Sequence, residues 1–195
     1  MDAAHLASGL DGFYNITVKN LATPLSNRFF DSLEPLNDFT STWIGIVRDD
    51  RDARELLTGN HIYVPQTFKT SNDQVCASSM VYKSNSPYDT LVTNVTNLRT
   101  NLVPVRQCVY NTQNFDSDTP VLASDPAGLL TTRSWGKAHM FAGTNRRAVE
   151  YALNVFLCRD ISSLRDSEMP DWHIDRKSTR LNSSHIQKSR MPSSA

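Results

Sequence analysis

Residues able to carry out acid–base or metal chemistry are densest in the segment 48–55. Four carboxylates and three arginines lie there: Arg48, Asp49, Asp50, Arg51, Asp52, Arg54 and Glu55. Such a cluster suggests a cation site. If the segment is helical, however, Arg48 faces Asp52, Asp50 faces Arg54 and Arg51 faces Glu55, because residues four apart are neighbours on a helix. A carboxylate already paired with arginine is a poor ligand for a hard cation. We therefore favour a structural charge network, with no metal and no catalytic residue.

Two further arginines, Arg146 and Arg147, fall in the first turn of an expected helix that Thr144 caps. The helix dipole is positive at that end, so two cations there need a negative partner. One hypothesis is a clamp onto the cluster of Asp49, Asp50 and Asp52. The other is an anionic ligand. We favour the clamp, because no motif in the sequence specifies a ligand.

His139 and Met140 end the preceding expected helix. A histidine at a helix C-terminus interacts favourably with the helix dipole. We favour this electrostatic role for His139. The alternative is that either residue serves as an axial metal ligand. The remaining histidines show no zinc-binding spacing, and the chain has neither a glycine-rich phosphate loop nor a Gly-x-Ser-x-Gly nucleophile motif. Whether the chain is an enzyme stays open.

Three cysteines, Cys76, Cys108 and Cys158, have no Cys-x-x-Cys spacing, so nothing supports a zinc or thioredoxin-like site. Two interpretations stay open. Cys76 and Cys108 could pair in an oxidising compartment, or all three could be ordinary buried thiols.

The elements that position these residues are expected to be mainly helices. We predict one helix over 12–25 and a second from Pro35 to a stop at Gly59 and Asn60. The buried face of the second helix is expected to consist of Leu36, Phe39, Trp43, Ile46 and Val47. A short extended segment is predicted over 61–68, and a loop over most of 69–87.

The middle of the chain is harder to assign. Residues 88–100 suit either a helix or an extended segment, and residues 101–125 read as irregular. A helix over 127–140 is predicted to follow the cap Asp125 and the first-turn Pro126. The final helix, from Thr144 to about Cys158, has apolar residues on all sides and is expected at the centre of the core. The predicted class is a mainly α, irregular helical domain over 1–174, with a polar, irregular middle at 64–124.

Residues 175–195 are interpreted as a non-native, disordered tail. Written back into codons, 175–185 and 189–195 match the two ends of a common short-read sequencing adapter, and 186–188 fall where a sample index sits. Without this tail Lys+Arg falls from 20 to 15 and Asp+Glu from 20 to 19, which leaves a charge of −4. That charge argues against a nucleic-acid partner. No run of about 18 apolar residues indicates a transmembrane segment, and no signal peptide is apparent.

Three stretches together resemble a known family: PLNDFTSTWIGIVRDDRDARELLTGNHIY over 35–63, DPAGLLTTR over 125–133 and AGTNRRAVEYALNVFLC over 142–158. Their order is similar to a group of uncharacterised extracytoplasmic bacterial proteins, often predicted lipoproteins. In that group, helical domains precede a Cys-x-x-Cys-His segment that attaches a c-type haem. The native sequence stops near Ile174, before any such motif, so we expect a domain truncated at its C-terminus.

The resemblance implies a fragment of a cytochrome-c-like, periplasmic or outer-membrane-associated protein. These residues alone would bind no cofactor covalently. The intact protein would carry haem c and have a redox partner for electron transfer, with His139 and Met140 as candidates for an axial ligand. The alternative is a non-redox binding or structural module.

Overall fold

The computed structural model describes residues 3–26, 34–70, 76–110, 120–140 and 145–160. The chain divides into one compact unit over Met1–Cys158 and a second over Arg159–Ala195. In the second unit the described residues are Arg159 and Asp160, so the interpreted adapter tail lies outside the described part. Within the described ranges, no helix is long and apolar enough to cross a membrane.

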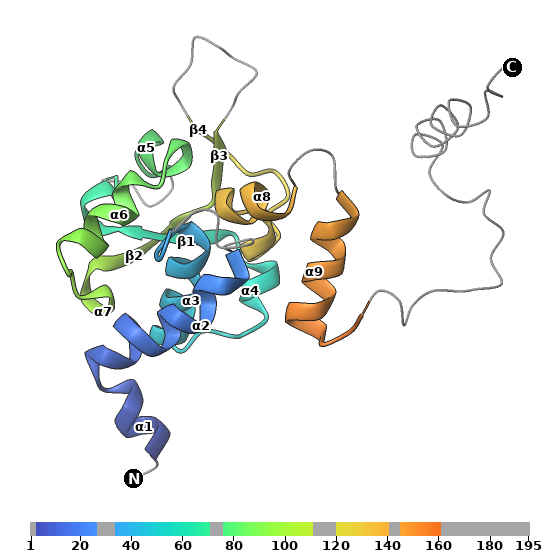
Figure 1. Ribbon diagram of the computed structural model, residues 1–195. Helices are drawn as coiled ribbons and strands as arrows, with labels where there is room; N and C mark the ends of the chain where they lie inside the picture. Colours follow the sequence, from blue (N-terminus) through green and yellow to red (C-terminus); the bar gives the residue numbers. More distant parts are fainter. Residues whose placement is uncertain (1–2, 27–33, 71–75, 111–119, 141–144, 161–195) are drawn as a thin grey trace, which may run out of the picture. The chain divides into compact units, whose positions relative to one another are not determined.

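The first unit is mainly helical with two small sheets, which confirms the predicted fold class (Figure 1). Its central element is helix α3, Asp38–Arg48, eight of whose eleven residues are buried. The Asn37 side chain caps this helix by accepting a hydrogen bond from the Thr40 amide at 2.9 Å. Pro35 therefore lies before the helix and not in its first turn.

Helix α3 ends ten residues earlier than the sequence pattern predicted. Asp50 has a φ of 49°, and the amides of Asp50 and Arg51 donate back to the carbonyls of Val47 and Ile46. These two bonds form a Schellman motif, which terminates a helix at a residue with positive φ. The predicted stop at Gly59 and Asn60 instead follows a separate short helix, α4, Glu55–Thr58.

Strand β1, His61–Pro65, confirms the predicted extended segment and is followed by a short 3₁₀ turn, Gln66–Phe68. It pairs antiparallel with β2, Leu102–Arg106, in a register that sets Tyr63 opposite Pro104. A second ladder joins β3, Cys108–Tyr110, to β4, Pro120–Leu122. The expectation that 101–125 is irregular was wrong for these three strands, because strand pairing depends on partners elsewhere in the chain that local residue types do not indicate.

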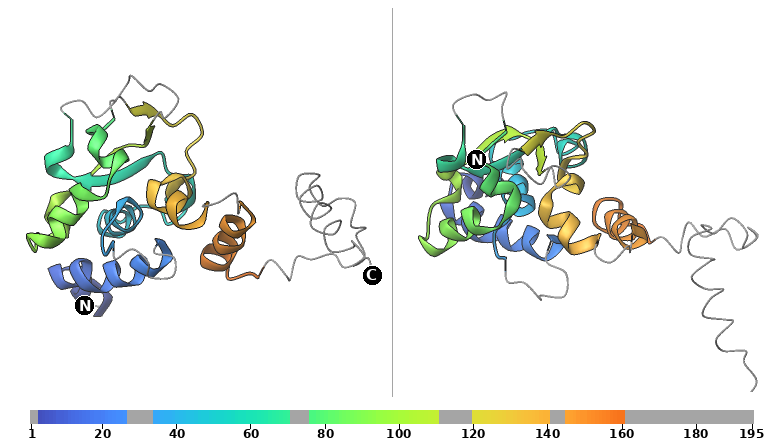
Figure 2. Two further views of the ribbon diagram at one scale, coloured as in Figure 1. Left: turned by 45° about the horizontal axis from the view of Figure 1, so that its top comes forward. Right: turned by 90° about the horizontal axis from the view of Figure 1, so that it is seen from above.

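Helices lie on both sides of the β1–β2 ladder (Figure 2). On one side α3 packs between the ladder and the N-terminal helices, which are α1 (Ala3–Ser8), the π-helix Phe13–Val18 and α2 (Lys19–Ser26). On the other side lie α5 (Ser79–Lys83) and α6 (Ser86–Thr93), whereas the short α7 (Leu98–Asn101) contacts α3 and the π-helix. The predicted helix over 12–25 is thus present. The predicted loop over 69–87 contains two short helices, and residues 88–100 are largely helical.

The C-terminal part of the unit consists of a 3₁₀ turn, Gly128–Thr131, then α8, Arg133–His139, and α9, Asn145–Leu157. The cap of α8 is Thr132, whose hydroxyl accepts from the Trp135 amide, so the predicted cap at Asp125 was wrong. The central place predicted for α9 was also wrong. It lies at the edge of the unit, with Val149 55% and Leu157 59% exposed (Figure 1).

Buried apolar side chains form two clusters. The larger surrounds the β1–β2 ladder and includes Leu36, Ile44 and Tyr63, whereas the smaller consists of Phe39, Leu129 and Trp135. Of the predicted buried face, Leu36 is buried but lies before α3, and Phe39 and Ile46 are buried on it. Trp43 is partly buried, and Val47 is exposed where the helix ends. The smaller cluster connects α3 to α8 and to the apolar side chains of α9.

Candidate functional site

The predicted charge cluster begins at the C-terminus of α3, where Arg48 pairs with the adjacent Asp49. The Arg48 Nε lies 2.7 Å from one Asp49 carboxylate oxygen, and a terminal nitrogen lies 3.0 Å from the other. The remaining terminal nitrogen donates to the carbonyl oxygens of Arg99 at 2.9 Å and Leu102 at 2.7 Å. Arg48 thus ties the end of α3 to the start of β2.

Of the three pairs expected for a helical segment, one is present. Arg51 and Glu55 lie 2.8 Å apart. The pairs of Arg48 with Asp52 and Asp50 with Arg54 are absent from the described structure, because the helix ends before them. Asp52 pairs with Arg54 instead. Asp50 is the residue with positive φ at which α3 ends.

The side chains of Arg146 and Arg147 lie outside the described part of the structure. The proposed clamp onto the carboxylates of Asp49, Asp50 and Asp52 therefore stays a prediction. So does the competing anion site.

Tyr63 of β1 donates its hydroxyl hydrogen to the Asp49 carboxylate. Burial alone raises the pKa of Asp49, but the hydrogen bonds from Arg48 and Tyr63 and the charges of Arg48 and Arg51 lower it further than burial raises it. Burial and the adjacent Asp49 raise the pKa of Tyr63 well above its usual value of 10. Near neutral pH the Asp49 carboxyl group therefore stays ionised and the Tyr63 hydroxyl stays protonated. Groups that keep one protonation state suit a structural network better than proton transfer.

His61 adjoins this network and is buried, with its Nε2 3.4 Å from a Glu55 oxygen. Burial and the positive charge of Arg51 lower its pKa, against the smaller opposing effects of Glu55 and Asp49. Among the described residues, no three histidine, cysteine or carboxylate side chains gather closely enough to hold a metal ion.

His139 and Met140 occupy very different surroundings. His139 is 2% exposed, its Nε2 lies 3.1 Å from the Leu25 carbonyl oxygen, and its ring stacks on Tyr151. Its Nε2 is therefore already engaged within the fold. Met140 is 53% exposed and its side chain lines an apolar groove. The two residues do not point into a common site.

This apolar groove has a volume of about 340 Å³. It lies where α9 meets α8 and the segments around Leu57 and Leu130. All of its lining side chains are apolar or aromatic: Leu57, Leu130, Trp135, Met140, Ala148, Val149, Ala152, Leu153, Phe156 and Leu157. Sequence reasoning missed the groove because it read the apolar surface of α9 as core.

A smaller cavity of about 210 Å³ lies beside α8 and is lined by both Asp38 and Arg133. The Asp38 carboxylate is buried and accepts from the backbone amides of Arg133 at 2.7 Å and Ser134 at 3.1 Å. It therefore caps α8 from another helix. The Arg133 guanidinium donates to the Asn85 side-chain oxygen at 2.8 Å. Sequence reasoning did not single out these residues, because they are separated by about a hundred positions.

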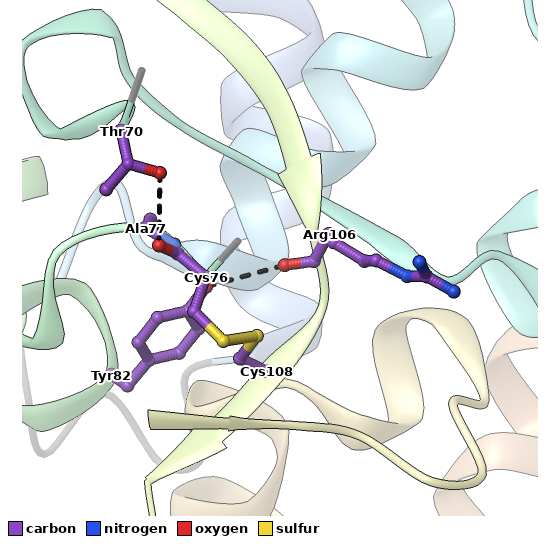
Figure 3. Close-up of a disulfide and its surroundings, with 6 residues drawn as sticks. All are labelled: Thr70, Cys76, Ala77, Tyr82, Arg106 and Cys108. Atoms are coloured by element: carbon purple, nitrogen blue, oxygen red, sulfur yellow. Dashed lines mark hydrogen bonds between the residues drawn. A yellow bond between two sulfur atoms is a disulfide. The ribbon is translucent and has the colours of Figure 1, made fainter. Parts of the chain in front are cut away.

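The disulfide Cys76–Cys108 joins the start of β3 to the segment before α5 (Figure 3). Its Cα atoms lie 5.8 Å apart, and both cysteines are buried. Around it, Tyr82 accepts from the Ala77 amide, and its hydroxyl lies 3.5 Å from the Arg106 carbonyl oxygen (Figure 3). Of the two interpretations of the cysteines, the structure has the pair, and Cys158 is an exposed free thiol.

Comparisons with protein-family models, with curated proteins and with solved structures found no match.

Proposed function

We propose that this chain is an extracytoplasmic, disulfide-stabilised binding module, whose groove along α9 receives a small apolar ligand. The groove carries the proposal. Its volume of about 340 Å³ lies within the range of about 300–1,000 Å³ typical of small-molecule sites. Its walls are apolar, and burial of apolar surface is the main favourable contribution to binding at such a site.

The extracytoplasmic compartment is supported by the disulfide. Disulfides persist in oxidising compartments and are rare where thiols are kept reduced. Two of the three cysteines form this bond and both are buried, as expected for a structural crosslink.

A matched pair of valines tests the binding site. Val149 lines the groove, whereas Val121 is similarly exposed on strand β4. Titration with the uncharged fluorescent probe N-phenyl-1-naphthylamine should show binding that Val149→Asn weakens about tenfold, because an apolar contact worth about 1.5 kcal/mol is replaced by a polar group. Val121→Asn should leave the affinity unchanged. Equal affinity in all three proteins would contradict the proposal.

The resemblance supports a second candidate, a scaffold for the haem segment of a longer cytochrome-c-like protein with a redox partner. One observation favours it: the Met140 thioether lines the apolar groove. The residues present do not fit covalent attachment, because the sequence has no Cys-x-x-Cys-His and two of its cysteines are already bonded to each other. We therefore derive no electron-transfer step. A Soret band in the full-length gene product, expressed with cytochrome c maturation, is the expected result, and its absence would remove this candidate.

A further inference from the structure

His139 lies where three helices meet. Its Nε2 lies 3.1 Å from the Leu25 carbonyl oxygen of α2, and its ring centroid lies 4.2 Å from that of Trp135 within α8. On the third side its ring stacks on Tyr151 of α9 with centroids 4.3 Å apart and planes at 25°. A single imidazole thus contacts α2, α8 and α9.

These contacts define which nitrogen carries the hydrogen. A carbonyl oxygen only accepts, so Nε2 must be the protonated nitrogen of the neutral ring. Nδ1 is buried and has no hydrogen-bond partner among the described residues. A second proton on Nδ1 would create a buried N–H without an acceptor and a buried charge, both of which are costly.

No described carboxylate offsets that charge. The titratable side chain facing the ring is Tyr151, while α2 presents a carbonyl and α8 presents Trp135. The other charged groups described on these helices are Lys19, Arg133, Lys137 and Glu150. Lys137 pairs with Glu34 at 2.5 Å, and Glu150 is exposed on α9.

Helix α9 has few other buried contacts. Ala148 is its buried residue among those described, and Tyr151, Ala152 and Phe156 are partly buried against the smaller core cluster. Phe156 stacks on Trp43 with centroids 6.1 Å apart. Trp135 contacts Tyr151 and Phe156, with ring centroids 6.1 and 6.2 Å apart. The His139–Tyr151 stack, at 4.3 Å, is the shortest of these ring contacts that attach α9.

We infer that His139 is a pH-sensitive latch, which holds α9 against the rest of the unit when its ring is neutral and releases α9 when its ring is protonated. Burial lowers the pKa of His139 from its ordinary value of 6.5, and the hydrogen bond with the Leu25 carbonyl only partly opposes this. The neutral ring therefore dominates at neutral pH, and acidification drives the release. Because α9 forms one wall of the groove, release would also open the groove, and this consequence rests on the proposed function.

Hydrogen exchange of the α9 amides in the full chain tests the latch without any ligand, so it can fail separately from the binding proposal. After correction for intrinsic exchange rates, protection of residues 145–157 should fall about tenfold between pH 7.5 and pH 5, which corresponds to about 1.4 kcal/mol. His139→Gln keeps an N–H donor for Leu25 but does not titrate, so its α9 protection should not depend on pH. His61→Gln removes the other described buried histidine and should retain the response.

Equal α9 protection at the two pH values in the unmodified chain would overturn the latch, and so would an unchanged pH response in His139→Gln. Titration of the His139 ring by NMR gives an independent readout that needs no variant. A pKa below 6.5 is expected, and a pKa at or above 6.5 would also overturn the proposal.

Discussion

A Cβ atom built on Gly45 would lie 2.2 Å from the ring of Tyr63, because the ring packs directly on the backbone of α3 at this glycine. Tyr63 is fully buried, and its hydroxyl reaches Asp49 at the end of the same helix. The missing side chain at Gly45 therefore permits β1 to approach α3 closely enough to bury Tyr63 and complete its hydrogen bond.

Replacing Gly45 with alanine should destabilise the fold by about 1–3 kcal/mol, the usual cost of overpacking a core. Urea unfolding measures the change. Gly136→Ala is the matched control, because a Cβ on this α8 glycine meets nothing within 4 Å. That control should gain about 0.5–1 kcal/mol from the better helix propensity of alanine. A Gly45→Ala protein as stable as the unmodified chain would contradict the close packing of Tyr63 on Gly45.

Val95 offers a stabilising change. It has a φ of 51°, is 90% exposed, and occupies the left-handed position of a Schellman motif in which Thr96 donates to the Leu91 carbonyl. A β-branched residue is strained there, whereas glycine is not. Val95→Gly should raise the free energy of unfolding by about 1 kcal/mol. Val109→Gly, at an exposed strand residue, should lower it, and a loss of stability in both variants would refute the assignment of strain.

Reduction of the disulfide should weaken the fold substantially. Cys76 and Cys108 are 32 residues apart. A crosslink over that separation stabilises the folded state by about 3–4 kcal/mol, because it restricts the conformations of the unfolded chain. The double replacement of both cysteines by serine should show this loss in urea unfolding, whereas Cys158→Ser should change stability by less than about 0.5 kcal/mol because its side chain is exposed. Detection of three free thiols in the protein purified from an oxidising compartment would contradict the pairing.

The two described buried histidines predict a pH dependence of stability. Both have a pKa below the ordinary 6.5, so the unfolded chain binds more protons than the folded chain just below pH 6.5. Stability is therefore complete above pH 6.5 and is lost as the pH falls towards the folded-state values. Urea unfolding at pH 7.5 and pH 5.5 should show this loss, and His61→Gln should reduce it. An equal loss with and without His61 would exclude its contribution.

The elements that could be predicted from sequence are those that depend on local signals. The apolar spacing of Phe39 and Ile46 correctly indicated α3, and the run from His61 correctly indicated a strand. The end of α3 was misplaced, because Asp50 adopts a positive φ where glycine is the usual signal. Strand β2 was missed because its partner β1 lies about forty residues earlier in the chain.

The candidate site was predictable only in part, because it depends on which side of a helix faces the core. Apolar residues all round α9 suggested a central helix, yet several of them form an exposed groove wall. His139 was recognised as a helix-end residue, but its stack on Tyr151 arises from tertiary packing alone. The Arg51–Glu55 pair predicted from four-residue spacing is present, although Arg51 lies between the end of α3 and the start of α4 and not in a helix.

Ligand binding in the groove is measured most directly by an NMR experiment that detects short contacts between bound N-phenyl-1-naphthylamine and the methyl groups of the protein. The groove predicts nuclear Overhauser effects from the probe to Ala148, Val149 and Ala152, which line one wall. It predicts none to Val109 or Val121, which are exposed on the β3–β4 hairpin. Contacts confined to the hairpin valines, or no contacts to the α9 methyl groups, would contradict binding in the groove.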